Sequence, residues 1–386
     1  MRISKLAVAA TVLASTLAYV PAVHAQSTIK LGVVLPTSGA GAATGLPILD
    51  GVKVAVEEIN AAGGVMGKKL EILSRDTQMK PATASSVAKE LLTKEGVQIF
   101  IGPATSAESL AVSEFAKTEK VIDIIPSAKT EALTGTNLHD YIFQLPPTTD
   151  VQGKRMAELL KKEIGAKSVC FTGYDYPYTQ DLFRNIRANL GDIKDAGSFL
   201  MPLGTTDYNT VITQLLGANC DTIMGTTWGP GFVAFVKQAT PFGLFKGRKL
   251  LWGSSVGGDG STTALGKAFP EGLWASADDL WYADATPAHV KYQRSLAKLE
   301  GRQDTNMWAI TGYNSVYLVK AGIEKAKSTE PAALSTAMAG ITFASPLGDL
   351  TVDPKNHRAN SPEFYGQIVS VPGSDIKRMA TPRLMH

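Results

Sequence analysis

Residues 97–126 read VQIFIGPATSAESLAVSEFAKTEKVIDIIP, a segment in which two apolar runs flank a more polar stretch. The runs Val97–Ile101 and Val121–Ile125 predict short strands, because each is apolar and rich in β-branched residues. Ser106–Lys117 between them predicts a helix. Parallel strands that are covered on both faces are continuously apolar, as these runs are. The segment therefore predicts a parallel β-α-β unit.

The same alternation of strand and helix extends from this segment toward both ends of the chain. The other predicted strands are Ile29–Leu35, Lys69–Ser74, Ser168–Phe171, Ser198–Met201, Thr222–Met224 and Lys249–Trp252. The pattern restarts after Leu145-Pro146-Pro147, and helical periodicity returns at Pro287–Leu299 and Tyr313–Lys325. The tail from Ser345 predicts short strands and turns. The chain is therefore predicted to be an α/β protein built from two successive parallel-sheet halves.

The N-terminus predicts export. A short basic start precedes the apolar run Leu6–Val20, and Val23-His24-Ala25 is a small-residue cleavage motif of the A-x-A kind. A membrane anchor needs about 20 apolar residues, more than this run has. Residues 1–25 are therefore predicted to be a cleaved signal peptide, with Gln26 as the first mature residue.

The net charge excludes two classes of partner. The formal charge of +3 falls to +1 once Arg2 and Lys5 of the signal peptide are removed. A near-neutral chain gives no electrostatic basis for binding nucleic acid or an anionic membrane surface.

Cys170 and Cys220 are the only cysteines. An even number of cysteines in an exported protein permits a disulfide. Both lie near the starts of predicted strands, however, and adjacent parallel strands rarely offer disulfide geometry. Buried free thiols are therefore the favoured prediction.

Turns rich in Gly and Pro fall at the carboxyl ends of the predicted strands. They are Pro36–Gly45, Gly102–Ser106, Pro126–Thr130, Gly173–Tyr178, Thr226–Gly231 and Gly253–Gly260. Ligands bind at that edge of open parallel sheets, so these six loops are the predicted site.

Motifs for enzymes are weak in this chain. Gly253–Gly257 fits the nucleophile elbow G-x-S-x-G with Ser255 as nucleophile, but glycines at 258 and 260 delay the helix that should follow. Gly39–Gly45 has a glycine spacing one residue too long for a dinucleotide loop. No histidine has a partner at metal-ligand spacing. We therefore predict no catalysis, no cofactor and no metal.

Four segments, taken in order, resemble one family. They are IKLGVVLPTSGAGAATG (29–45), GVKVAVEEINAAGGVMGKKLEIL (51–73), KEGVQIFIGPATSAESLAVSEFA (94–116) and IIPSAKTEALTG (124–135). The chain is similar in these segments to the leucine/isoleucine/valine-binding protein family, the periplasmic solute-binding proteins of branched-chain amino acid-type ABC importers. The resemblance extends from about Thr28 to about Val371.

The resemblance implies a two-lobed type I periplasmic binding protein, each lobe a three-layer α/β domain with a parallel sheet. One lobe should comprise 27–145 with 276–358, and the other 146–275 with 359–386. A small carboxylate ligand would be captured in the interlobe cleft by hinge closure. Inner-membrane permease subunits would recognise the closed form, and a monomer suits this motion.

The resemblance also places ligand contacts in the first lobe. Ser106 stands where the family's hydroxyl receives the ligand carboxylate, at a helix start that suits an anion, and Thr105 before it could offer its backbone. Ser127 and Ala128 match a loop whose main chain meets that carboxylate. Lys129 stands where members often carry Thr. It is either a solvated surface lysine or a cation that faces an anionic ligand.

The second lobe and the cleft mouth add four further positions. Tyr178 and Trp228 align with aromatic residues that close over the ligand. Thr44 stands where the family often has an aromatic residue, so it leaves more space. Ser255 stands where amino acid receptors place a carboxylate for the ligand ammonium.

Ser255 leaves the identity of the ligand undecided, because burying an ammonium without a carboxylate is costly. Either Asp259 or Asp278 replaces the missing carboxylate, or the ligand lacks an α-amino group. The predicted ligand is accordingly a branched-chain amino acid or an aromatic or related organic acid. An amide or urea receptor of the same fold and a secreted serine hydrolase that uses Ser255 are the alternatives.

Overall fold

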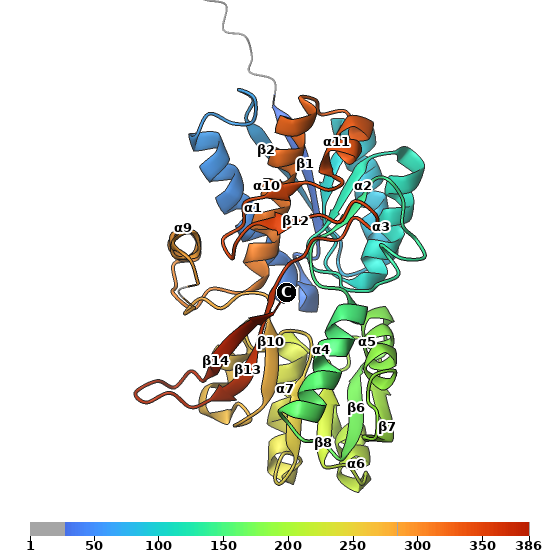
Figure 1. The fold of residues 1–386 in the computed structure, drawn as a ribbon, viewed down its shortest axis with the longest axis vertical. Coiled ribbons are helices and arrows are strands. Elements are labelled where there is room, and N and C mark those ends of the chain that lie inside the picture. The colour runs from blue at the N-terminus through green and yellow to red at the C-terminus, as the bar shows by residue number, and fades with distance from the viewer. Residues whose placement is uncertain (1–27, 284, 386) are drawn as a thin grey trace, which may run out of the picture.

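Two large β-sheets organise residues 28–283 and 285–385, which the computed structural model describes (Figure 1). The first sheet is entirely parallel and has the strand order β2-β1-β3-β4-β5. Its strands are β1 (Ile29–Leu35), β2 (Leu70–Asp76), β3 (Ile99–Ile101), β4 (Ile122–Ile125) and β5 (Ile142–Gln144). The predicted signal peptide and its cleavage before Gln26 lie outside the described residues.

The second sheet is parallel except at one edge and has the order β14-β13-β10-β9-β8-β6-β7. Its strands are β6 (Ser168–Tyr174), β7 (Lys194–Met201), β8 (Thr222–Gly225), β9 (Lys249–Trp252), β10 (Trp274–Ala277), β13 (Glu363–Val369) and β14 (Arg378–Met385). The tail after Ser345 contains strands, as predicted, but β13 and β14 are seven and eight residues long and not short. Pro382 hid β14 from the sequence pattern, and an edge strand tolerates a proline.

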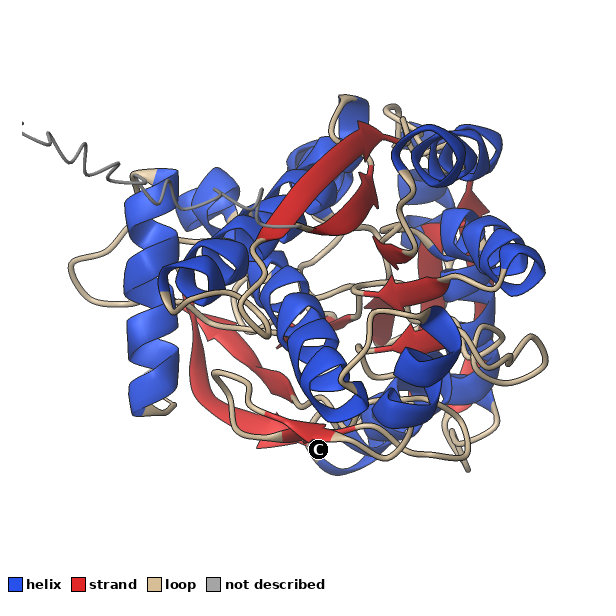
Figure 2. Ribbon diagram, turned by 90° about the horizontal axis from the view of Figure 1, so that it is seen from above, coloured by secondary structure: helices blue, strands red, loops and turns tan. Residues whose placement is uncertain are grey.

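Helices cover both sheets (Figure 2). They are α1 (Ala42–Ala61), α2 (Pro81–Glu95), α3 (Ser106–Glu119), α4 (Thr149–Lys162), α5 (Pro177–Arg187), α6 (Asn209–Gly217), α7 (Gly229–Ala239), α8 (Ser261–Leu265), α9 (Pro287–Glu300), α10 (Trp308–Ala326) and α11 (Pro331–Met338). A small ribbon pairs β11 (Thr342–Phe343) with β12 (Leu350–Thr351). No helix in the described ranges is long and apolar enough to cross a bilayer.

Neighbouring side chains in the central strands pack into different helical layers. In β1, Leu31 and Val33 belong to an apolar cluster with residues of α1, whereas Val34 packs with residues of α2 and α3. In β6, Phe171 packs with residues of α4 and α5, and Cys170 belongs to the cluster that includes α7. Because successive strand residues point to opposite faces, each sheet needs helices on both sides. The predicted α/β fold of two three-layer halves is confirmed.

Helices α1 and α10 cross at glycines. A Cβ atom on Gly51 would lie 1.7 Å from the carbonyl oxygen of Ala309, and one on Gly312 would lie 2.0 Å from that of Ile48. The two backbones therefore approach too closely for any side chain at the crossing. This contact joins the start of the chain to a helix more than 240 residues later.

Cys170 and Cys220 form a disulfide, so the prediction of free thiols was wrong. Cys170 is in β6, but Cys220 lies in the turn two residues before β8, where it is not held in the strand register. The turn allows a Cα–Cα separation of 5.7 Å, within the usual range for a disulfide.

The two sheets stack end to end along the long axis of the molecule, the first above the second in Figure 1. The connection at Leu145-Pro146-Pro147 joins β5 of the first sheet to α4 beside the second. β10 begins at Trp274 and belongs to the second sheet over its full length. The exact lobe boundaries at 276 and 359 stay a prediction.

Candidate ligand-binding site

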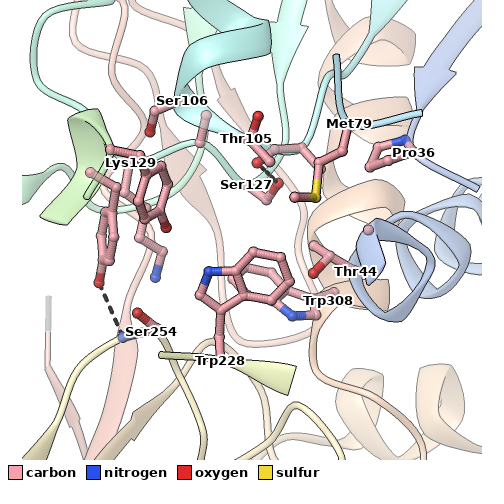
Figure 3. A pocket seen from close by; sticks show the side chains of 15 residues that line it. Pro36, Thr44, Met79, Thr105, Ser106, Ser127, Lys129, Trp228, Ser254 and Trp308 are labelled. Carbon is pink, nitrogen blue, oxygen red and sulfur yellow. Dashed lines mark hydrogen bonds between the residues drawn. The ribbon is translucent and has the colours of Figure 1, made fainter. Parts of the chain in front are cut away.

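Loops at the carboxyl ends of strands from both sheets line one cavity (Figure 3). The cavity has about 500 Å³ of space free of protein atoms, including its opening to solvent. Its lining residues are Pro36, Gly41, Thr44, Met79, Ala104, Thr105, Ser106, Ser127, Ala128, Lys129, Tyr176, Tyr178, Trp228, Ser254 and Trp308. Each of the six predicted loops contributes at least one residue, as expected for the binding edge of parallel sheets.

The structure brings most of the predicted contact residues together in this cavity. Those that line it are Thr44, Thr105, Ser106, Ser127, Ala128, Lys129, Tyr178 and Trp228. Ser255 does not line it; it is fully buried next to the cavity, behind Lys129. That the nine predicted residues contact a ligand stays a prediction.

The start of α3 presents hydrogen-bond donors to the cavity. Thr105 caps the helix: its hydroxyl accepts a hydrogen bond from the backbone N–H of Glu108, and its own N–H donates to the Glu108 carboxylate. The Ser106 side chain is 2% exposed and has no hydrogen-bond partner among the described residues. With the first-turn N–H groups that the capping hydrogen bonds of Thr105 and Glu108 do not use, this hydroxyl forms an arrangement suited to a carboxylate.

The Ser127 hydroxyl, unlike that of Ser106, hydrogen-bonds within the protein. It donates a 2.9 Å hydrogen bond to the carbonyl oxygen of Ala104, which ties the loop after β4 to the loop after β3. The Ser127 side chain therefore fixes the shape of the cavity, and its backbone remains the group available to a ligand.

Four aromatic side chains surround the remaining space: Tyr176, Tyr178, Trp228 and Trp308. The Tyr178 hydroxyl accepts a 3.1 Å hydrogen bond from the N–H of Ser254, which fixes its ring. Burial raises the pKa of Tyr178, so its hydroxyl stays protonated. Flat apolar faces around a few donors are typical of sites for small aromatic ligands.

Trp308 and Tyr176 were missed by the sequence analysis. Trp308 is the first residue of α10 and lies five residues before the predicted helical segment Tyr313–Lys325. Tyr176 lies in the predicted loop 173–178, so its place at the edge of the sheet was the available signal.

Lys129 is buried rather than solvated, and its ammonium meets two carboxylates. Nζ lies 2.8 Å from Oδ1 of Asp278 and 2.6 Å from Oε1 of Glu363. The side chain is 3% exposed, and Nζ lies 5.8 Å from the ring centroid of Trp308. Lys129 thus reaches from the first sheet to residues that begin or follow strands of the second.

Burial and pairing act in opposite directions on these charges. Burial alone would lower the pKa of Lys129, but the two carboxylates raise it, so the lysine stays charged. Burial would raise the pKa of Glu363, but Lys129 and the hydroxyl of Tyr365 lower it below its ordinary value. Burial and the nearby charge of Glu363 raise the pKa of Asp278 despite the attraction of Lys129.

Neither aspartate proposed for a ligand ammonium lines the cavity. Asp278 is paired with Lys129 and accepts a 3.3 Å hydrogen bond from the Ser255 hydroxyl. Asp259 accepts hydrogen bonds from the backbone N–H groups of Gly229 and Ser261 and lines a neighbouring groove instead.

The structure does not bring a histidine together with Ser255, as the serine hydrolase alternative would require. Ser255 is 0% exposed and hydrogen-bonds to Asp278, whereas His289 bonds to Asp279 at 2.6 Å. No described histidine hydrogen-bonds to Ser255. The described residues also contain no group of three His, Cys, Asp or Glu that could hold a metal ion.

Fold and cavity together define a two-lobed receptor for a small molecule. The sequence profile of the family described as "Periplasmic binding protein" matches residues 28–372. The chain belongs to this periplasmic binding protein family.

Individual relatives resemble the chain over most of its length. The leucine-, isoleucine-, valine-, threonine-, and alanine-binding protein of Pseudomonas aeruginosa is 26% identical over 338 residues, which cover 87% of this chain and 88% of the relative. The crystal structure of the branched-chain amino acid transporter substrate binding protein LivJ from Streptococcus pneumoniae, in complex with isoleucine, has a TM-score of 0.80 at 22% identity and covers 92% of this chain and 100% of that one. An ABC transporter solute binding protein from R. palustris, in complex with benzoate, has a TM-score of 0.83 at 18% identity and covers 93% of this chain and 98% of that one.

Proposed function

We propose that this protein is the periplasmic substrate-binding component of an ABC importer and captures a small carboxylate that lacks an α-amino group, such as a benzoate-type acid. Family membership, the predicted signal peptide and the cavity between the two sheets support this function. The lobes 27–145 with 276–358 and 146–275 with 359–386 would close around the ligand as a monomer. The closed form would then deliver the ligand to inner-membrane permease subunits, without catalysis.

One observation carries the choice of ligand: no carboxylate of the described residues lines the cavity. The donors at the start of α3 suit the ligand's own carboxylate, and the aromatic side chains suit an apolar body. In this cavity an α-ammonium would find Lys129, hydroxyl groups and aromatic faces but no carboxylate side chain of the described residues, and burying it without a carboxylate would be unfavourable. The site therefore favours an acid over the corresponding amino acid.

The fold does not decide between these ligands, because structures named for isoleucine and for benzoate both share it. A branched-chain amino acid is the second candidate, since several sequence relatives carry that specificity in their names. It requires Asp278 to leave Lys129 and turn toward the ligand. The amide or urea receptor gains no specific support from the cavity.

The experiment is a thermal-shift and calorimetric comparison of matched ligands on the mature protein, refolded from guanidinium to remove bound ligand. 3-Phenylpropanoate and L-phenylalanine differ only by the α-amino group, as do 4-methylpentanoate and L-leucine; benzoate, 4-hydroxybenzoate and acetamide complete the panel. A bound ligand at 100 times its Kd stabilises the fold by about 2.7 kcal/mol. We expect stabilisation by acids and none by amino acids. Tighter binding of L-leucine than of 4-methylpentanoate would refute the proposal.

A further inference from the structure

The Lys129 ammonium occupies a complete binding site for a primary ammonium group. It contacts Oδ1 of Asp278 and Oε1 of Glu363, and the Ser255 hydroxyl lies 3.5 Å away. The face of Trp308 adds a cation–π contact at 5.8 Å from its centroid. Carboxylates, a hydroxyl and an aromatic face are the groups that would hold the ammonium of a ligand.

This ammonium site lies at the edge of the ligand cavity. Lys129 and Trp308 line the cavity themselves, and Figure 3 shows both among the side chains around it. The two carboxylates are 5% and 0% exposed, so they lie behind Lys129 and away from solvent. Neither carboxylate lines the ligand cavity, so from this cavity a ligand ammonium could reach them only in place of the lysine side chain.

We propose that Lys129 is a specificity-determining residue: it acts as a tethered ammonium that fills this subsite and excludes ligands with an amino group. The inference rests on the proposed function and extends it. The positive charge of Lys129 repels a ligand ammonium, and its ion pairs with Asp278 and Glu363 occupy the acceptors that such a ligand would need. Replacing Lys129 by a smaller neutral residue opens a subsite for ammonium ligands.

The two carboxylates depend on Lys129 to different extents. Glu363 also accepts hydrogen bonds from Gln152 at 2.5 Å and from Tyr365 at 2.6 Å, and Arg155 lies 3.6 Å away. Asp278 has no cationic partner other than Lys129 among the described residues. Asp278 is therefore the carboxylate that would receive a new ammonium after Lys129 is truncated.

The test is chemical rescue of Lys129→Ala. Truncation leaves an uncompensated buried carboxylate and should lower the melting temperature. Butylammonium chloride should restore much of that loss, whereas butan-1-ol and sodium chloride should not. The double variant Lys129→Ala/Asp278→Asn should show no rescue. Lys320→Ala, which breaks an exposed ion pair with Glu324 far from the cavity, is the control that butylammonium should leave unchanged.

A second measurement uses the matched ligands. The ratio of Kd for L-phenylalanine to Kd for 3-phenylpropanoate should fall roughly tenfold or more in Lys129→Ala relative to wild type. If Lys129→Ala is insoluble, the same ratio is measured on Lys129→Ser, which is also smaller than lysine and neutral and keeps a hydroxyl that can hydrogen-bond to the buried carboxylates. An unchanged ratio overturns the inference.

The outcomes separate the two proposals. If wild type binds the acid but the variants gain neither butylammonium rescue nor amino acid affinity, Lys129 does not set specificity and the proposed function stands. If wild type binds neither acid nor amino acid, the proposed ligand class is wrong, and butylammonium rescue still decides whether Lys129 fills an ammonium site. If wild type binds both members of a pair equally, Lys129 excludes nothing and the inference fails.

Discussion

Ser106→Ala tests whether the start of α3 receives the ligand carboxylate. The hydroxyl is buried, lines the cavity and has no protein partner among the described residues, so a bound carboxylate would be its hydrogen-bond acceptor. Leaving a buried polar or charged group short of one partner costs about 1–3 kcal/mol. The Kd for a benzoate-type acid should therefore rise by a factor of roughly 5–150. The melting temperature of the ligand-free protein should change little.

The assay is isothermal titration calorimetry of wild type and variant with the acid that the ligand screen identifies. Ser113→Ala is a matched control, because Ser113 is on the same helix and is also 2% exposed. Its hydroxyl lies 3.0 Å from Nε2 of His139 and not in the cavity, so its removal should leave the Kd unchanged. An unaltered Kd in Ser106→Ala, or an equal rise in both variants, would contradict the assignment of this helix start.

Three further predictions concern stability. Both carboxylate oxygens of Asp123 are buried without a hydrogen-bond partner in the described structure, and burial raises the pKa of this group well above 3.8. The protonated Asp123 carboxyl group contributes its full stability below about pH 4, and this stability is lost as the pH rises toward the folded-state pKa. In urea unfolding at pH 8, Asp123→Asn should therefore have a higher free energy of unfolding than wild type by roughly 1–3 kcal/mol. A difference between variant and wild type that does not grow from pH 4 to pH 8 would contradict this. Replacing Cys170 and Cys220 by Ala should lower the free energy of unfolding by about 4 kcal/mol, because the disulfide closes a loop with a sequence separation of 50; a reducing agent should affect wild type only. Gly51→Ala should lower the melting temperature at a cost of about 1–3 kcal/mol or more, because its Cβ would overlap the backbone of α10, whereas Gly217→Ala, which meets nothing within 4 Å, should not.

The local pattern of the sequence was sufficient for most strands and helices. The ranges predicted for β1 and β9 agree with the structure at both ends, since their apolar runs are bounded by turn residues. The three-residue strand β5 and the four-residue strand β10 were missed. β9 also has four residues, but it is a mostly apolar run, KLLW, whereas β10 reads WASA and β5 has only the three residues IFQ. The two missed strands form because a neighbouring strand pairs with them.

The site was predictable as a set of loops but not as a set of contacts. Strand ends in a parallel sheet share one edge, so the order of elements was enough to bring the six loops together. The partners of Lys129 were not predictable, because Asp278 and Glu363 are 149 and 234 residues away in the chain. No local pattern distinguishes a buried lysine that finds two carboxylates from one on the surface.

The sequence by itself determined the alternation of strands and helices, the division into two sheets and the edge at which a ligand can bind, because periodicity, capping and turn chemistry act over a few neighbouring residues. Tertiary structure decided which groups remain available to a ligand at that edge. It paired Lys129 with Asp278, placed Trp308 in the cavity and joined Cys170 to Cys220. These contacts depend on how distant segments pack, which no local pattern of the sequence encodes.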